Sequence, residues 1–328
     1  MNTPVDERPT PIHPDPADPL AAVLEVMRLR EVDATTFTSV SLDRHNNRIF
    51  GGQVLAQSVL AAGATVPSDP VDGRFLHSVQ GYFLRPGRPE LPIVFTVERL
   101  HDGRSFSTRR THALQEGVPI LSFISSFQKD QEGYHLQRRK PPAPLPEQLP
   151  NSLEQFAAAA DNPAIREMAA TSPLDIRHCE RPLFLEPDPD KHSTQNLWMR
   201  LRSPLPEGSD PLLHKALLAY ACDQVALEPV LRSTGLCFMT PGLSMASLDH
   251  SMHFHRRVDM NRWHLYAQRA ISAYGGRGKA SADIFDEEGR HVASLTQEGM
   301  VRAPMPGAPA PAMREISGPT SALFGVPG

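Results

Sequence analysis

The second half of this 328-residue chain imperfectly repeats its first half. The spacing is nearly constant at three matching pairs: Phe83 and Phe254 are 171 positions apart, Gly117 and Gly289 are 172 apart, and Ser122 and Ser294 are 172 apart. A period of half the chain predicts two copies of one module, each large enough to bury its own core. Two unrelated antiparallel sheets with similar patterning are the alternative.

Each copy has the same predicted order, a strand and a helix followed by an antiparallel meander. In the first copy these are a strand at Thr35–Leu42, a helix from Gly51, and strands at His77–Leu84, Ile93–Leu100, Phe106–Leu114 and Ile120–Phe127. In the second they are a strand at Leu197–Arg200, a helix at Leu217–Val230, and strands at Leu243–Arg256, Trp263–Ser272, Lys279–Phe285 and His291–Val301. Turn-forming residues such as Gly, Asn and Asp separate the strands, which is typical of hairpins.

Proline content places the boundaries between these parts. We expect a flexible N-terminus at 1–18, a first module at 19–130, a proline-rich connector at 131–190, a second module at 191–303 and a flexible tail at 304–328. Asp18 followed by Pro19 is typical of an N-cap and the first residue of a helix. A short helix is expected within the connector, at Leu153–Ala160.

Composition is that of an ordinary globular protein, with 40% hydrophobic residues, 21% charged residues and a net charge of −4. There is no basic surplus to suggest a nucleic-acid or membrane partner, and the N-terminus has no apolar run typical of a signal peptide. Cys179, Cys222 and Cys237 form no metal-ligand pattern and leave an odd number for disulfides. We therefore expect a reducing compartment, the cytoplasm.

Short motifs in both halves resemble those of one family. They are Gly51-Gly52-Gln53, His77-Ser78, Tyr82 to Gly87, Asp102-Gly103, Arg109-Arg110, Ser126-Phe127-Gln128, Asp249-His250-Ser251-Met252, Phe254-His255-Arg256 and Gln297-Glu298-Gly299. Together they resemble acyl-CoA thioesterase II. The resemblance implies an α+β double hotdog, in which each antiparallel sheet wraps around a long helix and the two sheets join as an internal pseudo-dimer. It also implies hydrolysis of acyl-coenzyme A without a cofactor or metal.

Matched to that family, the catalytic residues fall on Asp223, Ser247 and Gln297, which would hold and activate a water. Asp223 shares a helix stripe with apolar residues three and four positions away, where a carboxylate is expensive unless it is hydrogen-bonded. Gln297 shares the apolar face of its strand with Ala293 and Leu295. The alternatives are a solvated Asp at the edge of its helix and a buried Gln that satisfies a backbone group.

Ser247 fits this group least well. Strict alternation places it with Asp249 and Ser251 on the more polar face of the strand, away from Met252 and Phe254. A β-bulge would re-aim the hydroxyl. Serine replaces the threonine that is commoner in the family, and the hydroxyl is retained.

Substrate-binding positions are expected at Gly51, Gly52, His250, His255 and Arg256, with the last two near the coenzyme A phosphates. His250 and His255 face opposite sides of one strand, so they and His253 do not form a metal site. For the oxyanion, backbone N–H groups near Gly51 and Gly52 or near Cys222 are both candidates.

The repeat also bears on how many sites the chain has. Subtracting offsets of 170 to 172 places Gln53 opposite Asp223, Leu76 or His77 opposite Ser247, and Ser125 opposite Gln297. The first module would then lack the carboxylate, so we expect one working site per chain, in the second module.

Two other functions remain as alternatives. An acyl-CoA sensor without catalysis needs only the pocket, and a hotdog enoyl-CoA hydratase needs a His a few residues from an Asp at the start of the central helix. No such His follows Asp223 up to Glu228. An exposed joined sheet further predicts a homo-oligomer, either a dimer or a tetramer.

Overall fold

The computed structural model describes residues 10–43, 47–67, 73–151, 154, 165 and 170–304. Of the segment predicted to be flexible at 1–18, residues 10–18 are described, and Ile12 forms a bridge with Leu42. The predicted tail at 304–328 and the predicted helix at Leu153–Ala160 lie almost wholly outside the described residues. The elements of the first half are α1 (Pro19–Met27), β1 (Arg30–Asp33), β2 (Thr36–Ser39), α2 (Gly51–Gly63), β3 (Arg74–Phe83), β4 (Ile93–Asp102), β5 (Phe106–Gln115) and β6 (Val118–Lys129).

The second half repeats this order with additions. Its elements are a 3-10 turn (Pro146–Gln148), β7 (Leu174–His178), β8 (Thr194–Leu201), α5 (Pro211–Val225), α6 (Glu228–Thr234), β9 (Ser244–Ser247), β10 (Asp249–Phe254), β11 (His264–Tyr274), β12 (Arg277–Asp286) and β13 (His291–Arg302). Two predicted elements are each divided. The helix expected at Leu217–Val230 breaks between α5 and α6, and the strand expected at Leu243–Arg256 breaks at Leu248.

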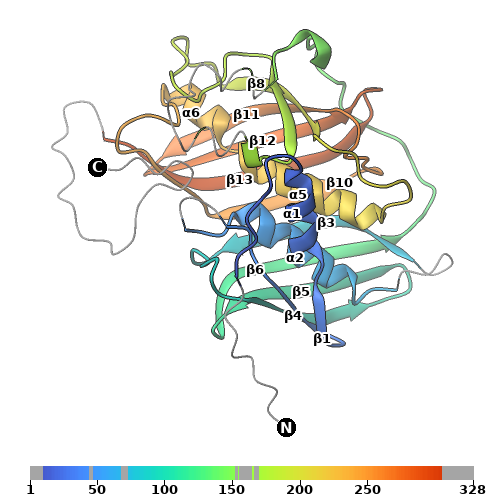
Figure 1. Cartoon of the computed structure of the whole chain (residues 1–328). Helices are drawn as coiled ribbons and strands as arrows, with labels where there is room; N and C mark the ends of the chain where they lie inside the picture. The colour runs from blue at the N-terminus through green and yellow to red at the C-terminus, as the bar shows by residue number, and fades with distance from the viewer. Residues whose placement is uncertain are drawn as a thin grey trace.

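All the strands belong to one antiparallel sheet in the order β1-β2-β4-β5-β6-β3-β10-β13-β12-β11-β8-β7, and β9 also pairs with β13. The five strands β2-β4-β5-β6-β3 recur in the second half as β8-β11-β12-β13-β10, so the two modules meet edge to edge at β3 and β10. Figure 1 shows the first-module strands in teal and green continuing into the orange strands of the second, with α2 and α5 against one side. The predicted double hotdog is confirmed.

The seam between β3 and β10 shows the internal symmetry directly. Gln80 pairs with Ser251, which is 171 positions later, and the neighbouring pairs are arranged symmetrically about it: Val79 with Met252 and Gly81 with His250. A local two-fold axis therefore passes through the Gln80–Ser251 pair. For the strands that follow the central helix of each module, the offset read from the sequence agrees with the structure.

The central helices follow a different offset. Phe95 pairs with Phe37, and Tyr266, 171 positions after Phe95, pairs with Leu197, so β8 follows β2 by only 160 positions. The helices share this shorter offset, since α2 begins at Gly51 and α5 begins 160 positions later. The insertion of α6 and its following loop accounts for the difference of 11. The prediction that Gln53 lies opposite Asp223 is therefore wrong, because position 223 minus 160 is Gly63.

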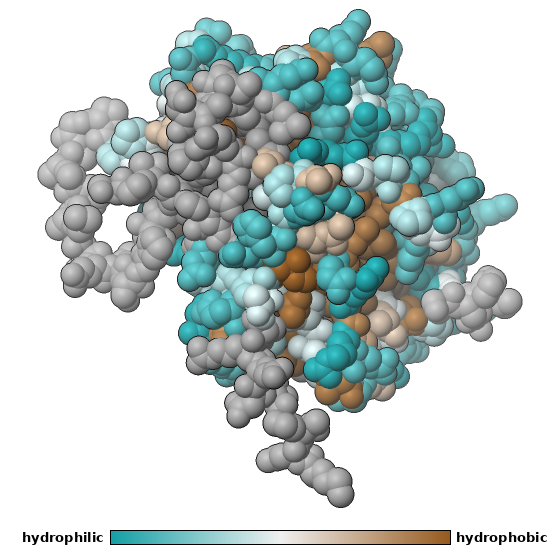
Figure 2. All heavy atoms as spheres, viewed as in Figure 1, coloured by the Kyte–Doolittle hydropathy of each residue, from teal (hydrophilic) through white to brown (hydrophobic). Residues whose placement is uncertain are grey.

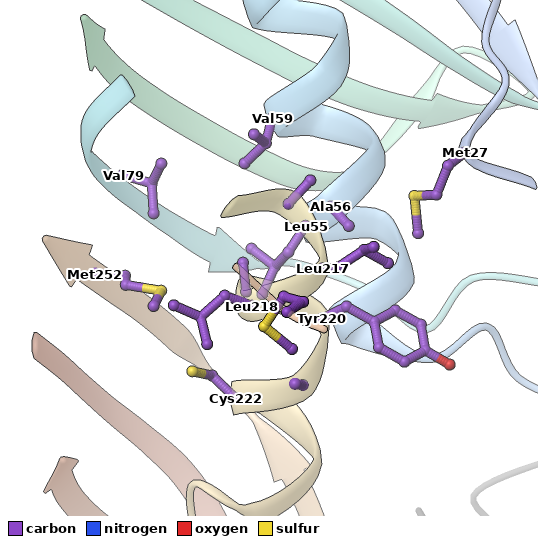
Figure 3. Close-up of a cluster of buried hydrophobic side chains, with 14 of the residues drawn as sticks. Met27, Leu55, Ala56, Val59, Val79, Leu217, Leu218, Tyr220, Cys222 and Met252 are labelled. Carbon is purple, nitrogen blue, oxygen red and sulfur yellow. The ribbon is translucent and has the colours of Figure 1, made fainter. Parts of the chain in front are cut away.

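The core lies between the sheet and the two antiparallel central helices. Figure 3 shows side chains of α2 and α5 gathered with Val79 of β3 and Met252 of β10. The helices touch closely, since a Cβ built on Gly52 would lie 2.6 Å from the carbonyl oxygen of Tyr220. Burial of one apolar side chain is worth about 1.5–3 kcal/mol, so this shared core joins the modules.

The connector is more than a linker. Its residues 174–178 form β7, which extends the second sheet beyond β8. Earlier in the connector, the carbonyl oxygen of Pro144 accepts a hydrogen bond of 2.9 Å from the indole of Trp198.

The surface is mainly hydrophilic in Figure 2, with apolar side chains gathered near the centre of the view, where Figure 1 labels α1, α2 and α5.

Candidate active site

Asp223 lies in the last turn of α5, a helix whose start is well defined. The side chain of Asp210 accepts a hydrogen bond of 2.8 Å from the backbone N–H of Leu212, and Pro211 occupies the first helical position, as expected for a capped start. At the other end, Oδ1 of Asp223 accepts hydrogen bonds from the hydroxyl of Ser247 at 2.9 Å and from Nε2 of Gln297 at 2.8 Å. The half-buried carboxylate is thus hydrogen-bonded, as its place on an apolar stripe requires.

Gln297 of β13 completes this group. Its side chain is 1% exposed, and its Nε2 lies 2.8 Å from the hydroxyl oxygen of Ser247. The structure therefore brings Asp223, Ser247 and Gln297 into mutual contact, although they come from a helix and two strands. We call these three residues the Asp223 group.

A β-bulge at Leu248 explains how Ser247 reaches this group. Ser251 pairs with Thr296, whereas Ser247 pairs with Gly299, so four steps along β9 and β10 match three steps along β13. The extra residue reverses the alternation, so Ser247 lies on the same face as Gln297. The expectation from strict alternation is wrong for this reason. β3 has an equivalent irregularity between Leu76 and Ser78.

The second oxygen of Asp223 faces the first module. A Cβ built on Gly51 would lie 2.8 Å from Oδ2 of Asp223 and 2.8 Å from the ring of Phe83. Gly51 and Gly52 are the first two residues of α2, and the first N–H groups of a helix have no partner within it. The positive end of the α2 dipole therefore lies beside the carboxylate, where negative charge is stabilised.

Of the other predicted substrate-binding residues, His250 lies behind Gln297 rather than at the surface. Its side chain is 1% exposed, and its Nδ1 lies 2.7 Å from Oε1 of Gln297. Burial lowers the pKa of His250 and thereby favours its neutral form. The sequence holds the signal for this placement, because His250 shares the inner face of β10 with Met252 and Phe254.

The structure does not bring His255 and Arg256 to the Asp223 group. They follow β10 at its far end, five and six residues beyond His250, or about 16–20 Å along an extended chain. Nε2 of His255 lies 2.9 Å from the hydroxyl of Ser294, and the guanidinium of Arg256 donates to the carbonyl oxygen of His291 at 2.6 Å. A phosphate role for these two residues gains no support from this placement.

In the described part of the chain, one group of at least three potential metal ligands gathers, formed by Asp188, Asp190 and His192. Asp188 already accepts a hydrogen bond of 3.1 Å from the buried guanidinium of Arg232. Because this cation neutralises the one buried carboxylate, the group offers little to a metal ion.

Cys222, which precedes Asp223, does not have the properties of a nucleophile. It is completely buried, and burial together with the charge of Asp223 raises its pKa well above the usual range. The reactive form of cysteine is the thiolate, so this side chain remains an inert thiol. A covalent route through Cys222 is therefore disfavoured.

The position related to the Asp223 group by the two-fold axis lacks every one of its parts, and we call it the mirror position. Gly63 replaces Asp223 at an offset of 160, Leu76 replaces Ser247 at 171, and Ser125 replaces Gln297 at 172. Pro211, which has no N–H, replaces Gly51. A Cβ built on Gly63 would lie only 2.1 Å from the side chain of Leu212, so that side chain fills the space.

Comparison with known proteins agrees with this architecture. Residues 38–128 match the acyl-CoA thioesterase N-terminal domain, and residues 146–301 match the acyl-CoA thioesterase C-terminal domain. The chain belongs to the acyl-CoA thioesterase family. Its resemblance to acyl-CoA thioesterase II, noted from the motifs, is confirmed by the relatives described next.

These family members align over nearly their whole lengths. Acyl-CoA thioesterase 2 of Haemophilus influenzae is 33% identical over 291 residues, which is 87% of this chain and 99% of the relative. Acyl-coenzyme A thioesterase 8 of Homo sapiens is 31% identical over 304 residues, which is 88% of this chain and 92% of the relative. The crystal structure of an acyl-CoA thioesterase II from Mycobacterium marinum has a TM-score of 0.68 at 38% identity and covers 86% of this chain and 98% of its own.

A more distant structure supports the fold alone. A hotdog protein of unknown function from Alicyclobacillus acidocaldarius has a TM-score of 0.67 at 18% identity, covering 87% of this chain and 99% of its own. In the described residues of this thioesterase family member, no helix has the length and apolar character needed to span a membrane.

Proposed function

We propose that this chain hydrolyses the thioester of acyl-coenzyme A at the Asp223 group, in the second module. Membership of the acyl-CoA thioesterase family supports the activity, and the geometry of these residues supports their assignment. Asp223 acts as the general base for a water that Ser247 and Gln297 help to hold. The amides of Gly51 and Gly52 stabilise the oxyanion.

The chemistry requires one proton acceptor and one set of hydrogen-bond donors. Oδ2 of Asp223 takes a proton from the water as the water oxygen bonds to the acyl carbonyl carbon. The carbonyl oxygen becomes an oxyanion, which the N–H groups at the start of α2 stabilise. The C–S bond then breaks, the coenzyme A sulfur takes the proton back from Asp223, and the fatty acid leaves.

One observation carries the residue assignment: the two oxygens of Asp223 have different neighbours. Oδ1 accepts hydrogen bonds from Ser247 and Gln297, and Oδ2 faces Gly51 across the junction of the modules. A base oxygen held in this way lies beside helix N–H groups that favour negative charge. The proposed base and the proposed oxyanion donors are thus adjacent.

Replacement of Asp223 tests the assignment. We expect Asp223→Asn to lower kcat by about 10²- to 10⁴-fold, because the amide cannot accept the proton from water. The measurement is release of coenzyme A thiol from acyl-CoAs of several chain lengths, and the exposed Asp130→Asn serves as a matched control. Wild-type turnover by Asp223→Asn would exclude Asp223 as the base, whereas acyl-CoA binding without thiol release by the unaltered chain would favour a sensor.

We further propose that the protein works in the cytoplasm as a homo-dimer or homo-tetramer. Its three cysteines are free, which suits a reducing compartment. Large apolar side chains are exposed on the strands near the seam, among them Phe75 at 41% and Tyr82 at 63%. Exposed apolar area of this kind favours self-association, and light scattering at several protein concentrations measures it.

A further inference from the structure

The orientation of the Gln297 amide is dictated by its neighbours. Nε2 of Gln297 lies 2.8 Å from Oδ1 of Asp223. An ionised carboxylate only accepts hydrogen bonds, so the amide nitrogen and not the amide oxygen must face it. The reversed amide would place its oxygen against the carboxylate, and the two would repel each other.

That orientation in turn fixes the proton on His250. With the nitrogen toward Asp223, Oε1 of Gln297 points to Nδ1 of His250 at 2.7 Å. An amide oxygen only accepts, so Nδ1 must carry the hydrogen. A single chain of donors follows, from His250 to Gln297 and from Gln297 to Asp223 and Ser247.

His250 is held firmly enough to act as a fixed support. It lies on the inner face of β10, its neighbour Ser251 pairs with Thr296 of β13, and its side chain is 1% exposed. Burial lowers its pKa, so the ring is neutral and has one N–H, which the geometry places at Nδ1. Nε2 is buried and has no hydrogen-bond partner among the described residues, so nothing competes to turn the ring.

The mirror position supports a link between His250 and Gln297. The counterpart of His250, at an offset of 171, is Val79, and the counterpart of Gln297, at 172, is Ser125. Where the first module lacks the glutamine it also lacks the histidine. The hydroxyl of Ser125 is buried there without a hydrogen-bond partner among the described residues.

We propose that His250 is a positioning residue, which acts through Gln297 by donating its Nδ1–H to Oε1 and thereby keeps the amide N–H groups of Gln297 directed at Asp223 and Ser247. This inference rests on the proposed function, because it assigns His250 to the same site. His250 itself touches neither the water nor the acyl group. Its effect is to remove the alternative amide orientation.

The test uses three substitutions of His250 in the full chain. His250→Leu removes the donor, and we expect kcat to fall by about 10- to 100-fold with KM changed less than about threefold. The amide N–H of an asparagine lies near the position of imidazole Nδ1, whereas that of a glutamine lies near Nε2. His250→Asn should therefore recover to within about fivefold of wild-type kcat, and His250→Gln should not.

A pH profile separates positioning from a loss of packing. In His250→Leu the amide of Gln297 is free to turn, so the charged form of Asp223 loses a hydrogen-bond donor. The acid limb of kcat/KM should move to higher pH in His250→Leu and stay in place in His250→Asn. Met252→Leu, a buried change on the same face of β10, is the control, and we expect both its rate and its pH profile to match wild type.

A double-mutant cycle decides whether the effect passes through Gln297. In a Gln297→Ala background, His250→Leu should lower kcat by less than about twofold further, since the residue it positions is absent. An equal loss in both backgrounds, or equal recovery by Asn and Gln, would overturn the inference. If Gln297→Ala itself has wild-type kcat, the proposed active site fails. If only His250→Leu has wild-type kcat, the inference alone fails.

Discussion

The two ends of the seam between the modules have the same backbone arrangement but different side chains. At one end the Asp223 group lies beside Gly51, at the start of α2. At the other, Gly63 and Leu76 stand in place of Asp223 and Ser247, and Leu212 fills the space. The β-bulge is present at both ends, at Leu248 and between Leu76 and Ser78. The bulge is thus a property of the fold, and the catalytic potential resides in the side chains added to it.

If the proposed site is correct, it needs both modules. The second module supplies the carboxylate, hydroxyl and amide side chains, and the first supplies the helix N-terminus at Gly51. The mirror position has neither contribution. Pro211, in place of Gly51, has no N–H, and Gly63, in place of Asp223, has no side chain. A second site would need more than a restored carboxylate.

Among the substitutions that compare the two ends, the largest effect is expected when a residue of the Asp223 group is replaced by its counterpart at the mirror position. Gln297→Ser introduces the residue found at position 125 and removes two hydrogen bonds of 2.8 Å. We expect kcat to fall by about 10²- to 10³-fold, comparable to the loss of a preorganised donor. Ser125→Ala is the matched change at the other end and should leave kcat unaltered. Equal rates for both variants would remove the asymmetry on which the comparison depends.

A methyl group added to each helix gives an intermediate effect that differs in kind between the ends. Gly51→Ala brings a Cβ to 2.8 Å from Oδ2 of Asp223, so kcat should fall by about 10- to 100-fold as the carboxylate is displaced. Gly63→Ala brings a Cβ to 2.1 Å from the side chain of Leu212. There we expect unchanged kcat and a loss of about 1–2 kcal/mol in the free energy of unfolding.

Thiol release and urea unfolding, measured on both glycine variants, separate these outcomes. A loss of activity in Gly63→Ala without a loss of stability would mean that the filled end takes part in catalysis.

The smallest effect concerns acid stability, for which the modules also differ. His264 of β11 is buried, and burial lowers its pKa to about 4, whereas its counterpart in the first module at an offset of 171 is Ile93. An unfolded histidine has a pKa near 6.5, so the stabilising contribution is complete above that pH and is lost as the pH falls toward 4. At pH 5 this residue alone should reduce the free energy of unfolding by about 2 kcal/mol.

The comparison variant is His264→Ile, which carries the residue of the first module. Urea unfolding at pH 7.5 and pH 5 should show a smaller difference in stability for this variant than for the wild type. If both proteins lose the same stability on acidification, His264 does not contribute to acid sensitivity.

Much of this architecture could be predicted because strands have a regular alternation of apolar and polar residues. The alternation of apolar residues and the turn glycines place β4, β5, β12 and β13 within a few residues of their observed bounds. The offset of 171 between Phe83 and Phe254 is the same as that of the pair Gln80–Ser251 at the symmetry axis. The burial of Gln297 is likewise predicted, since its strand face is apolar, whereas its place beside Asp223 and Ser247 is expected only from the family resemblance.

The helix register could not be predicted, and the reason is physical. The insertion of α6 between α5 and β9 lengthens the second module, so the elements before it, β2/β8 and α2/α5, have an offset of 160 and the strands after it have one of 171 or 172. Only the pairing of Phe37 with Phe95 and of Leu197 with Tyr266 shows that the offset is 160 at this point. The approach of Gly51 to Asp223 is similarly hidden, because it depends on two helices packing antiparallel across a module boundary.

The seam has a consequence for how such a chain can be divided. A cut in the connector would leave the helix amides of Gly51 and Gly52 on one fragment and the Asp223 group on the other. Each fragment would carry half of a reaction centre, and the two would depend on fragment complementation through β3 and β10 to restore it. The covalent link keeps both parts of the proposed active site within one chain.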